Sequence, residues 1–284
     1  GETGRAIWFH SDLNPFSDWS AMRRQVQGKT KEDIMMRVYG WVSNLNSSNF
    51  PKFSNVHILS DEDLPDPGEC THYFSLDPAG ARNWYGLWAM VDDCDRIYIY
   101  REWPTYEEYG DWALEDKNKK DGKAGPAQTT GAGRSFEEYR EMFRRYEGGM
   151  EIFERYIDPR AGKTAAASLK TGNTSVIDLL GTDTDESLGM QFKASRQTDI
   201  DEGIGIINSL LAYDESEPLT TLNEPKLYIS NRCKNLIWSM ENWTGEDRDK
   251  GASKDPIDTL RYLVMEKIEY LKKGAFKGYP GGSY

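Results

Sequence analysis

The sequence predicts a mixed α/β domain with a lead-in segment before it. Three strand-like runs follow one another closely between residues 71 and 103, with turn-forming residues between them. After residue 135, amphipathic helical patterns alternate with short strand-like runs. Strands joined by short turns pair antiparallel, whereas strands that alternate with helices build parallel units. We therefore expect a mixed sheet, with three antiparallel strands first, parallel strands after them, and flanking helices.

Composition indicates a folded protein with a substantial core. Of the 284 residues, 38% are hydrophobic and 12% aromatic, which excludes disorder throughout. No apolar run approaches the roughly 20 residues that a bilayer span needs. The three cysteines are odd in number and far apart, which favours reduced thiols in a cytosol-like compartment. The net charge of −12 argues against tight, unaided DNA binding.

Residues 1–68 read as a lead-in and linker. The chain starts without Met and without a signal-peptide pattern, so we expect a fragment or a processed chain. A capping box at 30–33 starts a helix, and residues 53–59 form a possible strand. The acidic, proline-bearing segment 61–68 resembles a linker.

The first sheet strands are expected at His72–Leu76, Tyr85–Val91 and Arg96–Trp103. The turns between them are rich in Gly, Asn or Asp, which predicts an antiparallel meander. The segment 105–134 has no clean periodicity, and its Lys/Gly-rich centre predicts a mobile loop.

The second half alternates helices and strands. A capping box at Ser135 starts a helix whose aromatic side chains share one face. The last helix is expected to begin at Pro256, a favoured first position, with an apolar stripe that continues to Leu271, and the tail 274–284 should fray. The other expected elements are strands at 151–157, 190–194 and 226–230 and helices at 174–181, 199–213 and 231–243.

Three aspartates are candidates for one site. Asp77 and Asp158 each end a strand expected to be central, and each precedes a proline. Asp258 lies in the first turn of the last helix, which should pack across both strands. Structural roles compete: Asp-Pro often ends a strand, and acids in a first turn complement the helix dipole. Together, however, three carboxylates are what a site for Mg²⁺ or Mn²⁺ requires.

Other catalytic motifs are incomplete. Residues 161–164 imitate the end of a phosphate-binding loop, but the first glycine is missing. Residues 203–208 hold only two glycines of a dinucleotide fingerprint and fall inside an expected helix. The scattered histidines and cysteines make a zinc site improbable.

Four series along the chain resemble the C-terminal nuclease domain of tailed-bacteriophage terminase large subunits, over residues 70–270. These series are Ser75-Leu76-Asp77-Pro78-Ala79-Gly80, Tyr98-Ile99-Tyr100-Arg101-Glu102-Trp103-Pro104, Tyr156-Ile157-Asp158-Pro159-Arg160-Ala161-Gly162 and Ser253-Lys254-Asp255-Pro256-Ile257-Asp258-Thr259-Leu260-Arg261-Tyr262. The Lys-Asp-x-x-Asp-x-Leu-Arg-Tyr ending is the most specific of them. The resemblance implies an RNase H-like fold for residues 69–273, with 1–68 leading in from an ATPase region.

The resemblance also implies a metal site. It assigns Asp77 as the central bridging ligand, Asp158 as the second-strand ligand and Asp258 as the helix ligand, with Asp255 as a possible fourth acid. Two Mg²⁺ or Mn²⁺ ions would then serve phosphodiester hydrolysis.

Phosphate contacts by Arg82, Arg160 and Lys254 are inferred from their proximity in sequence to these acids. The implied partners are double-stranded DNA, the terminase ATPase region, the small terminase subunit and the portal protein, with no membrane. The implied location is the cytoplasm of an infected bacterial host. No ATPase activity is expected from this chain, because it has no complete phosphate-binding loop.

Three alternatives stay open. The chain could be another RNase H-like nuclease, such as a resolvase or transposase. It could be a glycoside hydrolase, whose two carboxylates work without metal. It could also be an inactive module that docks DNA or the portal.

Overall fold

The computed structural model describes residues 49–78, 84–105, 135–160, 175–185, 188–196, 199–245 and 254–272. Contacts divide the chain into two compact units, Gly1–Ser47 and Ser48–Tyr284, and all described residues belong to the second. The expected helix after residue 30, nearly all of the loop 105–134 and the tail 274–284 lie outside the described residues.

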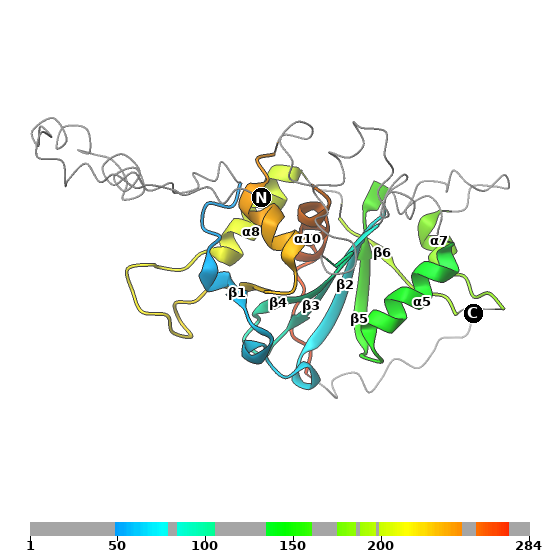
Figure 1. The fold of residues 1–284 in the computed structure, drawn as a ribbon, viewed down its shortest axis with the longest axis horizontal. Coiled ribbons are helices and arrows are strands. Elements are labelled where there is room, and N and C mark those ends of the chain that lie inside the picture. Colours follow the sequence, from blue (N-terminus) through cyan, green and yellow to red (C-terminus); the bar gives the residue numbers. More distant parts are fainter. Residues whose placement is uncertain are drawn as a thin grey trace, which may run out of the picture. The chain divides into compact units, whose positions relative to one another are not determined.

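Within these residues the strands form one seven-stranded sheet in the order β1-β7-β4-β3-β2-β5-β6 (Figure 1). β3 pairs antiparallel with both β2 and β4, whereas β5, β6, β7 and β1 join through parallel pairings. The expectation of a mixed sheet, with three antiparallel strands first and parallel strands afterwards, is confirmed. The strands are β1 (Ile58–Leu59), β2 (Thr71–Asp77), β3 (Tyr85–Val91), β4 (Ile97–Trp103), β5 (Ile152–Ile157), β6 (Lys193–Ala194) and β7 (Leu227–Ser230).

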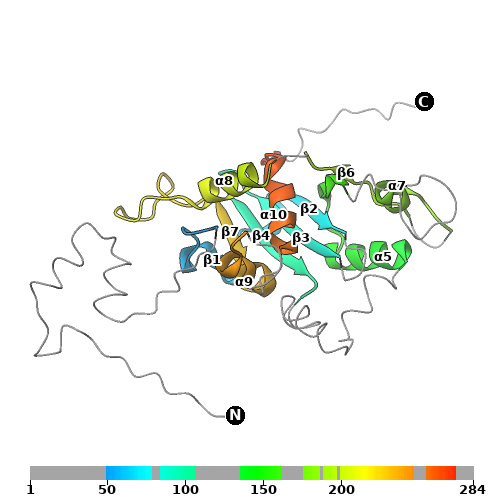
Figure 2. The ribbon, with the colours of Figure 1, turned by 90° about the horizontal axis from the view of Figure 1, so that it is seen from above.

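Helices cover both faces of the sheet (Figure 2). On one face, α8, α9 and α10 bury an aliphatic and aromatic core against alternate residues of the strands. On the other face, α5 and α7 cover an aromatic cluster around Phe74 and Trp88. The helices are α5 (Phe136–Glu147), α7 (Val176–Gly181), α8 (Ile200–Leu211), α9 (Lys234–Asn242) and α10 (Asp255–Met265), with short 3-10 turns η2 (Asn55–His57), η3 (Asp61–Asp63) and η4 (Pro67–Glu69).

Local sequence signals explain where α5 begins and ends. The Ser135 hydroxyl accepts the backbone N–H of Glu138, whose carboxylate accepts the N–H of Ser135 in return. This reciprocal pair is the capping box that the sequence predicted. Gly148 then ends the helix in a left-handed conformation, with φ of 61°, which glycine adopts without steric cost.

Several boundaries differ from the sequence-based expectations. The run 53–59 forms a 3-10 turn and only a two-residue strand, β1. The segment 49–68, expected to lead in and link, instead packs with the second unit, and β1 extends the sheet beside β7. The last helix starts at Asp255 and ends at Met265, so the apolar stripe to Leu271 outlasts the helix. No helix in the described ranges has the length and apolar character needed to cross a membrane.

Candidate active site

The two central parallel strands bring Asp77 and Asp158 to one edge of the sheet. β2 ends at Asp77, and its neighbour β5 ends at Ile157. The strands are in register, with Leu76 opposite Ile157, and the backbone N–H of Asp158 donates to Leu76 O at 3.0 Å. Because the carboxyl ends of parallel strands meet at the same edge, the two aspartates emerge side by side.

The first turn of α10 places Asp258 beside them. The Ser75 hydroxyl donates to Thr259 O at 2.9 Å, and both residues are fully buried. The Thr259 hydroxyl in turn donates to Asp255 O at 2.7 Å. These bonds fix the start of α10 over β2, two residues before Asp77.

The three carboxylates line one cavity of about 210 Å³. Its other lining residues are mostly cationic or aromatic: Arg160, Arg196, Lys254, Arg261 and Tyr262, together with Pro159 and Ile200. The fold thus places the three candidate acids around one cavity.

The electrostatic environment of the Asp258 carboxyl combines burial with charged neighbours. Burial raises the pKa of this carboxyl, and the charge of Asp158 raises it further, while Arg261 and Lys254 oppose both effects. Arg261 Nη2 donates to Asp258 Oδ1 at 2.8 Å, and Lys254 Nζ lies 3.7 Å from Oδ2. A buried acid with two cationic neighbours stays costly to ionise, which favours further positive charge near it.

The hydroxyl of Tyr262 lies within the electrostatic influence of all three acids. Burial raises the pKa of Tyr262 above its ordinary value, and Asp77, Asp258 and Asp158 each raise it further. Three carboxylates from three elements thus act on one phenol.

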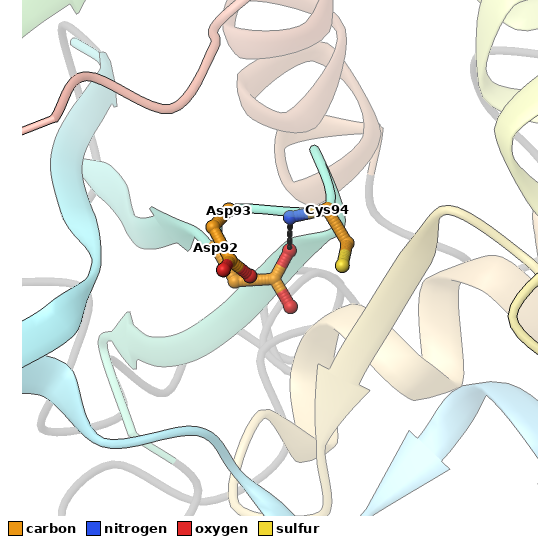
Figure 3. A group of neighbouring side chains, drawn as sticks. All are labelled: Asp92, Asp93 and Cys94. Atoms are coloured by element: carbon orange, nitrogen blue, oxygen red, sulfur yellow. Dashed lines mark hydrogen bonds between the residues drawn. The ribbon is translucent and has the colours of Figure 1, made fainter.

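The acids of the cavity are not the tightest acidic group. Among the described residues, one set holds three potential ligand atoms within 4.8 Å of one another: Asp92, Asp93 and Cys94 (Figure 3). Asp77, Asp158 and Asp258 therefore share a cavity, but their ligand atoms do not all lie within that distance of one another.

The Asp92 group is a turn between β3 and β4 rather than a metal site. Asp92 Oδ1 accepts the backbone N–H groups of Cys94 at 3.0 Å and Arg96 at 2.9 Å. Its Oδ2 accepts from Arg96 Nε at 2.7 Å and from the Tyr98 hydroxyl at 3.0 Å. Both oxygens are committed to protein donors, and Asp93 and Cys94 are exposed.

The remaining predicted residues fall in different places. Arg160 and Lys254 line the cavity, and the backbone N–H of Arg160 donates to Asp158 Oδ1 at 3.0 Å. Asp255 is buried as the first residue of α10 and does not line the cavity. Arg82 lies outside the described residues.

Sequence reasoning missed two cations of the site. Arg261 belongs to the Lys-Asp-x-x-Asp-x-Leu-Arg-Tyr series but was given no role. Arg196 follows β6, which pairs parallel with β5 and so ends at the same sheet edge. A strand was expected at 190–194, so the rule that identified Asp77 and Asp158 would also have pointed to Arg196, had the pairing of that strand with β5 been known.

No protein-family model matches the chain. No curated protein matches it either.

Among the solved structures similar in fold are phage large terminases. The large terminase of a thermophilic bacteriophage is 16% identical over 90% of this chain and 53% of its own, with a TM-score of 0.47. The chain thus spans about half the length of that protein. The P22 large terminase nuclease domain is 12% identical over 78% of this chain and 93% of its own, with a TM-score of 0.48.

Proposed function

We propose that this chain is a metal-dependent endonuclease that hydrolyses phosphodiesters of double-stranded DNA during phage genome packaging. One observation carries the proposal: β2, β5 and α10 bring Asp77, Asp158 and Asp258 to a single cavity that arginine and lysine side chains also line. The sequence series that ends in Leu260-Arg261-Tyr262 points to the same activity by its resemblance to terminase nuclease domains.

The donor set fits Mg²⁺ or Mn²⁺. Asp77, Asp158 and Asp258 supply only carboxylate oxygens, which hard divalent cations prefer. The raised pKa of Asp258 indicates a site in which a bound cation would relieve unfavourable negative charge. When bound, such ions supply an activated water and stabilise the oxygen that departs from phosphorus.

The chain's own side chains bind and orient. Arg160, Arg196 and Lys254 line the cavity with positively charged side chains, which would hold a DNA phosphate. Arg261 fixes the orientation of the Asp258 carboxylate through their hydrogen bond. Recognition through phosphates implies a preference for backbone shape over base sequence.

Nicking of supercoiled plasmid with Mn²⁺ tests the proposal. Asp77→Asn, Asp158→Asn and Asp258→Asn should each lower the nicking rate by at least about 100-fold, because each removes a charged ligand and leaves the shape of the side chain. A chelator should abolish nicking by the wild-type chain. Glu141→Gln removes an exposed acid of α5 and serves as the control that keeps full activity.

Two results would contradict the proposal. One is nicking that survives the chelator. The other is nicking that survives all three substitutions while their circular dichroism stays native. Chelator-resistant hydrolysis of a glycan, with no effect on plasmid, would favour a glycoside hydrolase instead.

The wider assignment rests on the sequence resemblance. We propose that the packaging ATPase region, the small terminase subunit and the portal protein are the partners. The corresponding location is the cytoplasm of the infected bacterium.

A further inference from the structure

A second cavity, of about 710 Å³, lies on the sheet face that carries α5 and is lined largely by arginine and tyrosine. A β-bulge creates one wall. Trp88 of β3 pairs with Arg101, but the next residue, Ala89, pairs with Ile99, so Tyr100 is an extra residue on β4. Both Tyr100 and Arg101 consequently line the same cavity.

Arg145 and Tyr146, in the last turn of α5, form the facing wall. The guanidinium carbons of Arg101 and Arg145 each lie 5.8 Å from the centre of the Tyr146 ring. Neither arginine forms an ion pair with a carboxylate of the described residues. Arg232, which does pair with Asp61, adds a third, largely exposed guanidinium.

The acid in the cavity wall does not neutralise these charges. Glu102 directs its carboxylate to the opposite face, where it accepts the Tyr85 hydroxyl at 2.6 Å and the backbone N–H groups of Asn235 and Leu236 at 2.9 Å. That carboxylate is therefore committed to the start of α9. In a chain with a net charge of −12, two guanidiniums against one ring are a local excess of positive charge.

We propose that this Arg101–Arg145 cavity is a second subsite for the sugar-phosphate backbone of nucleic acid, separate from the carboxylate cavity. Guanidinium groups match phosphate geometry through paired N–H donors. Aromatic rings beside arginine add stacking surface and pre-order the guanidiniums. The choice of nucleic acid over another polyanion as the ligand rests on the proposed function. It would hold DNA that flanks the cut, away from the reacting phosphate.

Binding without cleavage tests the subsite. Fluorescence anisotropy of a labelled short duplex is followed against NaCl concentration, in EDTA, for the full chain. Arg145→Gln, an exposed position on α5, should lower the slope of log K against log salt by about 1, since one phosphate contact is lost. Arg101→Gln/Arg145→Gln should lower the slope by about 2 and weaken binding roughly tenfold at low salt.

Two sets of controls separate charge from folding. Lys52→Gln/Lys272→Gln removes two charges from exposed positions outside the cavity and should leave the slope unchanged. Arg101→Lys/Arg145→Lys keeps the charge and should restore most of the slope. An unchanged slope in Arg145→Gln overturns the subsite. Poly-glutamate bound as tightly as the duplex, and lost equally in the arginine variants, overturns nucleic acid as the occupant.

The subsite and the proposed nuclease can fail separately. A wild-type chain that binds the duplex with the full slope but never nicks plasmid removes the nuclease and keeps the subsite. A double arginine variant that cuts with wild-type KM and binds with the wild-type slope removes the subsite and keeps the nuclease.

Discussion

Several charged residues in this protein stabilise the fold in ways that the sequence around them does not predict. Arg140 is fully buried and donates to the backbone carbonyls of Leu179 and Thr182, so a cation holds the end of α7. Glu102, on β4, accepts hydrogen bonds from the backbone N–H groups of Asn235 and Leu236 in the first turn of α9. Asp92 organises the β3–β4 turn through four donors. Buried charges persist here because each has several hydrogen-bond partners.

Asp92 leads to a prediction about pH. Burial alone would raise the pKa of this carboxyl, but donors from Arg96 and Tyr98 outweigh burial and lower it. A lowered pKa stabilises the fold above the unfolded value of about 3.9, and this stabilisation is lost as pH falls through the folded pKa. Asp92→Asn should therefore lower the free energy of unfolding by about 2 kcal/mol at pH 7.

Urea unfolding of both chains at pH 7 and near pH 3 measures this difference. The gap between wild type and Asp92→Asn should shrink at the lower pH, because the wild-type carboxyl approaches protonation there. A gap that is equal at both pH values would show that the carboxylate charge contributes nothing.

At the scale of elements, α8 packs closely against a side chain of α10, and a glycine of α8 makes room for it. A Cβ at Gly203 would overlap Cγ and Cδ of Arg261, the residue that holds Asp258. The same helix carries Gly205, where a Cβ would meet open space. Gly203 is thus required by close packing beside the cavity, whereas Gly205 is not.

The two glycines form a matched pair of variants. Gly203→Ala should destabilise the fold by about 1–3 kcal/mol, since overpacking outweighs the gain in helix propensity. It should also lower plasmid nicking, because Arg261 must shift from Asp258. Gly205→Ala should stabilise the fold by up to about 1 kcal/mol and leave nicking unchanged. Thermal unfolding and nicking of both variants decide the matter, and equal behaviour of the two would refute the packing argument.

At the scale of the whole molecule, the segment before β2 is an integral part of the second unit. Phe50 is buried, with its ring stacked on Trp243 at 6.1 Å between centroids. His57 is fully buried, and its Nε2 donates to Leu211 O at 2.9 Å. These contacts tie residues 49–59 to α8 and α9.

Truncated chains test whether the folded unit begins at Ser48 or at residue 69. A chain that starts at Ser48 should unfold at the wild-type temperature in a single transition. A chain that starts at Cys70 should lose about 3 kcal/mol or more, because it uncovers Trp243 and removes the buried Phe50 and His57. Calorimetry of the two shortened chains checks this, and equal stability would return the boundary to residue 69.

Local patterns in the sequence were sufficient for most elements and for the three acids. Turn residues, capping boxes and apolar spacing act within a few positions, so β3 has the predicted bounds and α5 begins at the predicted cap. The order of elements then implied that Asp77 and Asp158 emerge side by side. Arg160, Lys254 and Arg261 lie within four residues of Asp158 or Asp258, so local spacing already brings them near the acids. Tertiary structure alone decided that the short strand before Arg196 pairs beside β5, and that Gly203 of α8 leaves room for Arg261 of α10. Such positions depend on packing between segments distant in sequence, which periodicity within one segment does not encode.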